Sequence, residues 1–191
     1  MKKIFSTGLI ASALLFGTIA CNQEQGAVEE AQETNEQMAD NTAMEDQMTN
    51  MSEFATQAAS NGMLEVEAGK LAQEKGQDQQ VKDYGQMMVT DHTKANDQLK
   101  QLAQQNNLML PDSMSQAHMD KMQELRDKTG ADFDKSYMEL MVSSHEDAVS
   151  LFEDASNNME NAEMKNFAST TLPTLRQHLD RANQINDGMN Q

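Results

Sequence analysis

Apolar residues recur at steps of three and four along four long segments of this chain, and this helical period restricts the fold more than any other feature. The clearest stripe lies within residues 78–106 and has a histidine at its centre. Its members are Val81, Gly85, Met88, His92, Ala95, Leu99 and Leu102. After residue 51 the sequence lacks the alternation of apolar and polar residues that is typical of strands. The sequence therefore predicts an all-α fold with a titratable imidazole facing its core.

The same arrangement returns twice further along the chain. The second stripe consists of Met138, Met141, His145, Ala148, Phe152 and Ala155. The third, near the C-terminus, consists of Met164, Ala168, Thr171, Leu175, His178, Ala182 and Ile185. The chain has four histidines, and three of them thus lie in the middle of apolar stripes on three different predicted helices.

The lengths of the connections predict how the helices are joined. We expect helices over about 52–75, 78–106, 132–157 and 160–187, and only a few residues separate the first two and the last two. Each pair is then an antiparallel hairpin. About two dozen residues, including Pro111 and a short predicted helix, link the hairpins, as in ferritin-like bundles. An up-down-up-down bundle with short loops fits this spacing less well.

The first helix contributes a carboxylate to the predicted interior. Its stripe is Phe54, Ala58, Glu65, Ala68 and Ala72, although Leu64 and Leu71 define a competing face. At about 1.5 Å per residue, the three central histidines fall at a similar height in a bundle of this connectivity. The four helices would then bring Glu65, His92, His145 and His178 together.

These four side chains predict a metal site. A buried carboxylate is costly unless it is paired or bound to a metal, and neutral imidazole is a common metal ligand. Three nitrogens and one oxygen suit one iron, manganese, zinc or copper ion, whereas calcium and magnesium prefer more oxygens. The alternative is a metal-free network of hydrogen bonds between Glu65 and the histidines that fixes the helix register.

The fourth histidine, His118, lies in the connection between the hairpins, near Met114, Met119 and Met122. A cluster of methionine and histidine could hold Cu(I). We favour the interpretation that these methionines fill gaps in the packing of a short amphipathic helix.

Residues 1–20 are typical of a secretory signal peptide, with two lysines, an apolar run and small residues. Cys21, the one cysteine of the chain, follows directly, as the lipidated cysteine does in bacterial lipoproteins, although Thr18 stands where that pattern prefers leucine. The alternative is an ordinary signal peptide with an incidental cysteine. A single cysteine excludes an intramolecular disulfide.

Residues 21–50 are polar and acidic, and we expect them to form a disordered tether between the lipid and a bundle domain at residues 51–188. The formal net charge of −17 argues against nucleic acid as a partner. The same charge argues against electrostatic adhesion to anionic lipid headgroups, so membrane attachment would depend on the lipid. Asn22 lacks the acidic character associated with inner-membrane retention in enteric bacteria, which favours a periplasm-facing lipoprotein of the outer membrane.

Four ordered motifs resemble the bacterial domain of unknown function 4142: "NGMLEVEAGKLAQEK", "MVTDHTKANDQLKQLA", "GADFDKSYMELMVSSHEDAVSLFE" and "TLPTLRQHLDRA". The resemblance covers about residues 50–186 and implies an exported, ferritin-like four-helix bundle, with no established activity. Ferritin-like di-iron proteins carry Glu-x-x-His on two helices. Here Val89, Val142 and Leu175 stand three residues before the histidines, so a mononuclear site fits better than a di-iron centre.

Together these features predict an exported, lipid-anchored envelope protein that binds one transition metal for metal handling or for a redox reaction. The alternative is a metal-free envelope binding or stress-response module whose histidines are structural. Motifs for a serine or cysteine nucleophile are missing from the sequence, which argues against a hydrolase. We therefore predict no catalytic residues.

Overall fold

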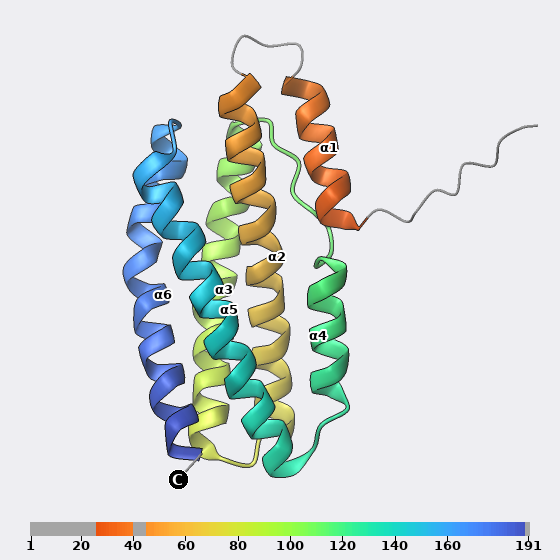
Figure 1. Cartoon of the computed structure of the whole chain (residues 1–191), viewed down its shortest axis with the longest axis vertical. Coiled ribbons are helices and arrows are strands. Elements are labelled where there is room, and N and C mark those ends of the chain that lie inside the picture. Colours follow the sequence, from red (N-terminus) through yellow and green to blue (C-terminus); the bar gives the residue numbers. More distant parts are fainter. Residues whose placement is uncertain (1–25, 40–44, 190–191) are drawn as a thin grey trace, which may run out of the picture.

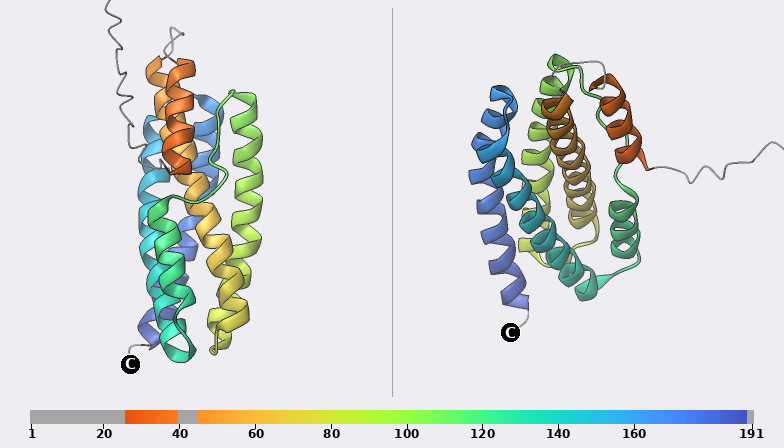
Figure 2. Two further views of the ribbon diagram at one scale, coloured as in Figure 1. Left: turned by 90° about the vertical axis from the view of Figure 1, so that its right-hand side faces the viewer. Right: turned by 45° about the horizontal axis from the view of Figure 1, so that its top comes forward.

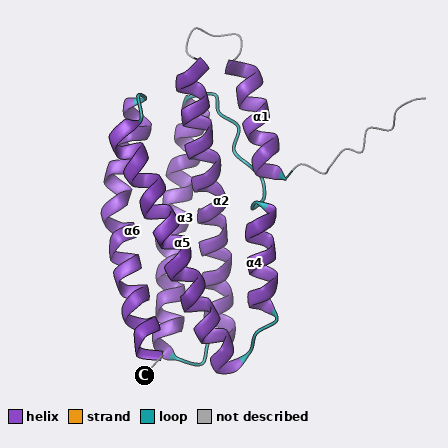
Figure 3. Ribbon diagram, viewed as in Figure 1, coloured by secondary structure: helices purple, strands orange, loops and turns teal. Residues whose placement is uncertain are grey.

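The computed structural model describes residues 26–39 and 45–189, and in these ranges every regular element is a helix (Figures 1 and 3). The helices are α1 (Ala27–Ala39), α2 (Glu45–Lys75), α3 (Gln79–Gln105), α4 (Gln116–Arg126), α5 (Gly130–Asn158) and α6 (Ala162–Met189). The predicted all-α class is confirmed.

Helices α2 and α3 form one antiparallel hairpin, and α5 and α6 form the other (Figures 1 and 2). The chain between them, residues 106–129, contains α4 and runs back along the length of the bundle. Helices α3 and α5 therefore run in the same direction, which is the connectivity of a ferritin-like four-helix bundle. This prediction is also confirmed.

The turn between α2 and α3 is fixed by two aspartates. Asp78 is the N-cap of α3, and its Oδ1 accepts a hydrogen bond from the backbone N–H of Gln80 at 2.7 Å. Asp134, buried near the start of α5, accepts hydrogen bonds from the N–H groups of Gln77 and Asp78. The contacts of Asp134 tie the turn of the first hairpin to the start of the second hairpin.

Helices α2 and α3 cross closely because two glycines face each other there. A Cβ atom on Gly69 would lie 2.7 Å from the carbonyl oxygen of Gly85, and a Cβ on Gly85 would lie equally close to that of Gly69. Any larger residue would push the helices apart. This contact lies one turn from Glu65 on α2 and two turns from His92 on α3, so it brings the two side chains within reach.

The buried apolar residues form two separate groups. We call the group nearer the α2 N-terminus the phenylalanine cluster; it includes Phe54, Phe152 and Phe167. The other, the tyrosine cluster, includes Tyr84, Tyr137 and Phe133, with several methionines. The polar residues of the predicted site belong to neither group.

The expectation of a disordered tether is wrong for residues 27–39 and 45–50, which are helical. Helix α1 packs along α2 and buries Val28, Ala31 and Ala39. Buried Asn35 hydrogen-bonds to Ser52 Oγ and to both the carbonyl and the N–H of Met109. These bonds satisfy backbone groups of the crossover and explain why so polar a segment folds. The predicted signal peptide and Cys21 lie outside the described residues.

Helix α6 continues through Pro173 without a break. None of the described helices combines the length and the apolar character needed to cross a membrane.

Candidate metal centre

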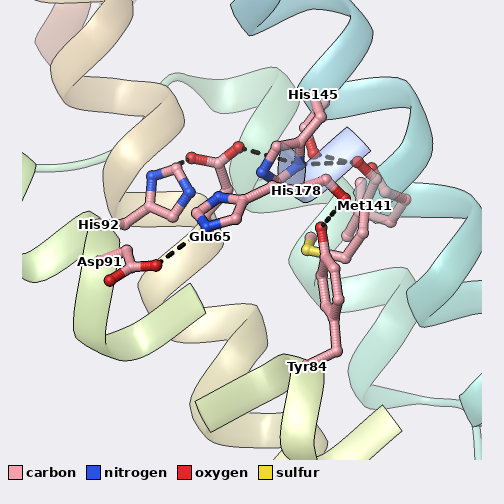
Figure 4. Close-up of polar contacts among 9 residues, drawn as sticks. Glu65, Tyr84, Asp91, His92, Met141, His145 and His178 are labelled. Atoms are coloured by element: carbon pink, nitrogen blue, oxygen red, sulfur yellow. Dashed lines mark hydrogen bonds and ion pairs between the residues drawn. The ribbon is translucent and has the colours of Figure 1, made fainter. Parts of the chain in front are cut away.

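Each helix of the bundle contributes one polar side chain to a buried layer between the two apolar clusters (Figure 4). Glu65 comes from α2, His92 from α3, His145 from α5 and His178 from α6, and each whole residue is at most 5% exposed. The three imidazole rings lie 5.4–5.5 Å apart between centroids. The structure therefore brings together the four residues that the stripes predicted.

One nitrogen of each ring is held by a hydrogen-bonding partner. His92 Nδ1 lies 2.7 Å from Glu65 Oε2, and His145 Nδ1 lies 2.9 Å from the carbonyl oxygen of Met141. His178 Nε2 lies 3.0 Å from Asp91 Oδ2. Such partners fix the orientation and the tautomer of an imidazole, because the bonded nitrogen must carry the proton.

The other nitrogen of each ring is buried without a hydrogen-bond partner: Nε2 of His92, Nε2 of His145 and Nδ1 of His178. Buried polar atoms of this kind are rare in native proteins and require an explanation. Each histidine offers one ring nitrogen in a group whose members all lie within 4.8 Å of one another. A tetrahedral ion with bonds of about 2.0–2.1 Å needs its nitrogens roughly 3.3 Å apart. The three residues therefore supply suitable donors for a metal ion, and the rings would have to move closer together to bind it.

Glu65 faces the outer nitrogens of two of these rings. One of its oxygens holds His92 Nδ1, and the other is 3.5 Å from His145 Nδ1, too far for a good hydrogen bond. The nitrogen of His145 is instead engaged by the Met141 carbonyl. In this arrangement the carboxylate orients a histidine, whereas the sequence analysis assigned it the role of a fourth ligand.

The charges in the layer depend on one another. Burial by itself raises the pKa of Glu65. The neighbouring His92 and His145 together lower it by more, so the pKa lies below its usual value. Burial lowers the pKa of His92, and the Glu65 carboxylate reverses the effect and raises it overall. Burial lowers the pKa of His145, and burial with the repulsion of His92 and His145 lowers the pKa of His178 to about 4. The latter two rings are therefore neutral at pH 7 and able to bind a metal.

Asp91 is the residue of this site that the sequence analysis missed. Its side chain is 41% exposed, yet it contacts His178, which is 3% exposed. Asp91 directly precedes His92 and so lies off the apolar stripe. A carboxylate beside the stripe of a neighbouring helix is a weak signal, because most such residues are simply solvated.

Two tyrosines border the layer on the side of the tyrosine cluster. Tyr84 donates a hydrogen bond of 3.1 Å to the carbonyl oxygen of His178, and its ring packs edge-on against His145. The hydroxyl of Tyr137 is buried without a partner. Burial raises the pKa of both phenols, so they stay protonated.

On the opposite side, a cavity of about 20 Å³ borders Glu65 and His92. Its walls are mainly apolar and include Leu99, Phe152 and Phe167. This space is sufficient for about one water molecule. The cavity itself is too small for an organic substrate.

His118 takes no part in this centre. Its Nδ1 lies 2.8 Å from Ser60 Oγ, which also accepts a hydrogen bond from the N–H of Ser115 at the start of α4. Met122 is buried within the tyrosine cluster, whereas Met119 is exposed. His118 therefore fixes the crossover against α2, and its neighbouring methionines point into different surroundings.

Residues 29–185 match the domain of unknown function DUF4142. The chain belongs to this family. A solved structure described as CopM in the Cu(II)-bound form is similar to it, with a TM-score of 0.62 and 17% sequence identity, and the match covers 73% of this chain and 96% of the CopM chain. At this identity the likeness establishes the fold. No curated protein matches the sequence.

Proposed function

We propose that this protein binds one transition metal ion through His92, His145 and His178 and serves in metal handling at the cell envelope. The observation that supports this most strongly is the set of three converging, buried ring nitrogens without partners. An apolar core gains nothing from such nitrogens, since each costs desolvation energy that no hydrogen bond returns. A bound ion would satisfy all three at once.

The residues around the rings prepare this donor set. Glu65, the Met141 carbonyl and Asp91 each hold the outer nitrogen of one histidine, which turns the inner nitrogen toward the common point. A bound ion would supply positive charge beside the ionised Glu65. It would also compete with the proton on His92, whose pKa is raised, so binding would release protons.

We propose copper as the first ion to test, with zinc, iron and manganese as the others. Imidazole donors suit all of these ions, and Cu(II) has the highest affinity among the divalent ions of the series. The solved Cu(II)-bound form of the structural neighbour CopM supports the same choice. The small size of the cavity beside Glu65 and His92 favours holding the ion over catalysis on it.

The membrane anchor is a separate proposal, supported by the leader-like residues 1–20 and by Cys21 after them. In it, a lipid on Cys21 holds the bundle at the periplasmic face of the outer membrane. Metabolic labelling with a fatty acid tests this: the label should enter the wild-type chain and be lost in Cys21→Ser. An unlabelled wild-type chain in the soluble fraction would contradict it.

The metal proposal is tested by elemental analysis and calorimetric titration of the full chain, purified in detergent without an affinity tag. The wild type should bind close to one ion per chain, and the His92→Ala/His145→Ala variant should bind none. His118→Ala is the matched control, because it removes a histidine outside the centre, and it should bind as the wild type does.

The competing function is a metal-free module in which the Glu65–His92 hydrogen bond of 2.7 Å fixes the helix register. In that case the wild type would remain free of metal after incubation with copper, zinc, iron and manganese. The double variant would then lose stability without any change in metal content.

A further inference from the structure

One carboxylate joins the buried centre to the solvent. The side chains of His92, His145 and His178 are 6%, 0% and 3% exposed, whereas that of Asp91 is 41% exposed and contacts His178 Nε2 at 3.0 Å. Figure 4 shows the Asp91 carboxylate beside the His178 ring, with His145 on the far side of that ring and His92 to one side. His178 is therefore the ring of the centre that contacts this solvent-accessible carboxylate.

A hydrated ion cannot reach the three inner nitrogens in the described arrangement, because each of them is buried. Some side chain must move, and the energetic cost is smallest where a single contact has to break. The outer nitrogen of His178 is held by one hydrogen bond, which it donates to a carboxylate that is itself partly solvated. His145 and His92, by contrast, are held by groups that are themselves buried.

We propose that Asp91 is the entry site for the metal ion and that His178 carries the ion from Asp91 into the centre. This inference rests on the proposed metal-binding function. The Asp91 carboxylate first captures a divalent ion from solvent. The His178 ring then swings outward, so that its free Nδ1 binds the captured ion.

Return of the ring completes the transfer. It brings the ion to His92 and His145, and the N–H at Nε2 of His178 donates again to Asp91. Nδ1 is the ligand throughout and Nε2 keeps its proton, so this histidine requires no change of tautomer. The strongly acidic chain, with a formal net charge of −17, raises the cation concentration near such an exposed carboxylate.

A second route into the layer competes with this one. The small cavity beside Glu65 and His92 is also lined by Gly62 and Asn96. The half-buried Asn96 side chain packs over Gly62, where a Cβ atom would collide with it. Shortening Asn96 would open this side without touching Asp91, so the two routes can be tested separately.

The test is the rate of Cu(II) uptake by the metal-free full chain, followed by stopped-flow competition with a chromophoric chelator. Asp91→Asn keeps an oxygen that can accept the hydrogen bond from His178 but removes the charge. It should lower the association rate constant about tenfold or more. The dissociation rate should fall as well, since the ion leaves by the same path, and Kd should change less than either rate.

The matched control is Asp97→Asn, which makes the same change in net charge at an exposed position on the same helix. Its association rate should stay within about twofold of the wild type, as expected for a remote, screened charge. An equal slowing in both variants would reduce the effect to overall charge and overturn the proposal.

Two other results would also overturn it. If Asp91→Asn leaves association unchanged and only accelerates dissociation, Asp91 merely orients His178. If Asn96→Ala accelerates uptake in the wild type and equally in Asp91→Asn, the ion enters beside Gly62. Failure of the metal-binding function itself is distinct, because the wild type would then take up no ion.

Discussion

The phenylalanine cluster and the histidine layer lie next to each other in one core, but they differ in whether their own contacts satisfy them. In the cluster, Phe54 meets Phe152 at 5.1 Å and Phe167 at 6.3 Å between ring centroids, in edge-on contacts. Such contacts are favourable and need no further partner. In the layer, three ring nitrogens are left without one. Packing accounts for the cluster, whereas packing alone leaves three nitrogens of the layer without partners.

The largest effect on stability should come from a substitution in the phenylalanine cluster that leaves the histidine layer intact. Phe54→Ala removes the ring that touches both other phenylalanines and should lower the free energy of unfolding by about 3–5 kcal/mol. The variant should melt at a lower temperature than the wild type. While it is folded it should still bind one ion, because the histidine layer is unchanged. Denaturant unfolding and metal titration check the two parts.

Phe54→Leu serves as a milder control and should cost markedly less, since most of the volume is retained. If Phe54→Ala abolished metal binding while remaining folded, the two regions would not be separable in the way described above.

An intermediate effect should come from acidifying the metal-free protein, which protonates His178 in the layer. His178 has a pKa of about 4 in the fold against 6.5 ordinarily, so between these pH values the unfolded chain binds the extra proton. Stability should therefore fall as the pH drops from about 6.5 toward 4, by an amount on the order of 2 kcal/mol.

Unfolding curves of wild type and His178→Gln across this range provide the measurement. The variant has no imidazole at this position and should show a shallower dependence on pH. Equal slopes would mean that His178 is not buried in its neutral form.

The smallest effect should come from the two tyrosine hydroxyls beside the layer. Tyr137→Phe removes a hydroxyl without a partner and should leave stability unchanged or raise it slightly, whereas Tyr84→Phe loses the bond to the His178 carbonyl and should cost about 1 kcal/mol. Thermal melts of the two variants, side by side, give the comparison. The reverse order would show that the Tyr137 hydroxyl has a partner in solution.

Helical periodicity was sufficient to predict the bundle and the meeting of its histidines. The stripes placed His92, His145 and His178 inward, and connection lengths then fixed which helices neighbour each other. The residues that escaped prediction depend on contacts between distant segments. Asp91 reaches across to α6, and Asn35 bonds with Met109, 74 residues away. Neither contact can be found from helical periodicity, because Asp91 and Asn35 lie outside the apolar stripes and meet their partners only when the helices pack together.

The distribution of the site over the chain has a consequence for when it can exist. His92 belongs to the first hairpin, whereas His145 and His178 belong to the second. A nascent or clipped chain that holds only one hairpin can offer at most two of the three nitrogens. The complete set appears only when both hairpins have docked, so occupancy of the centre would report that an individual molecule is whole and correctly assembled.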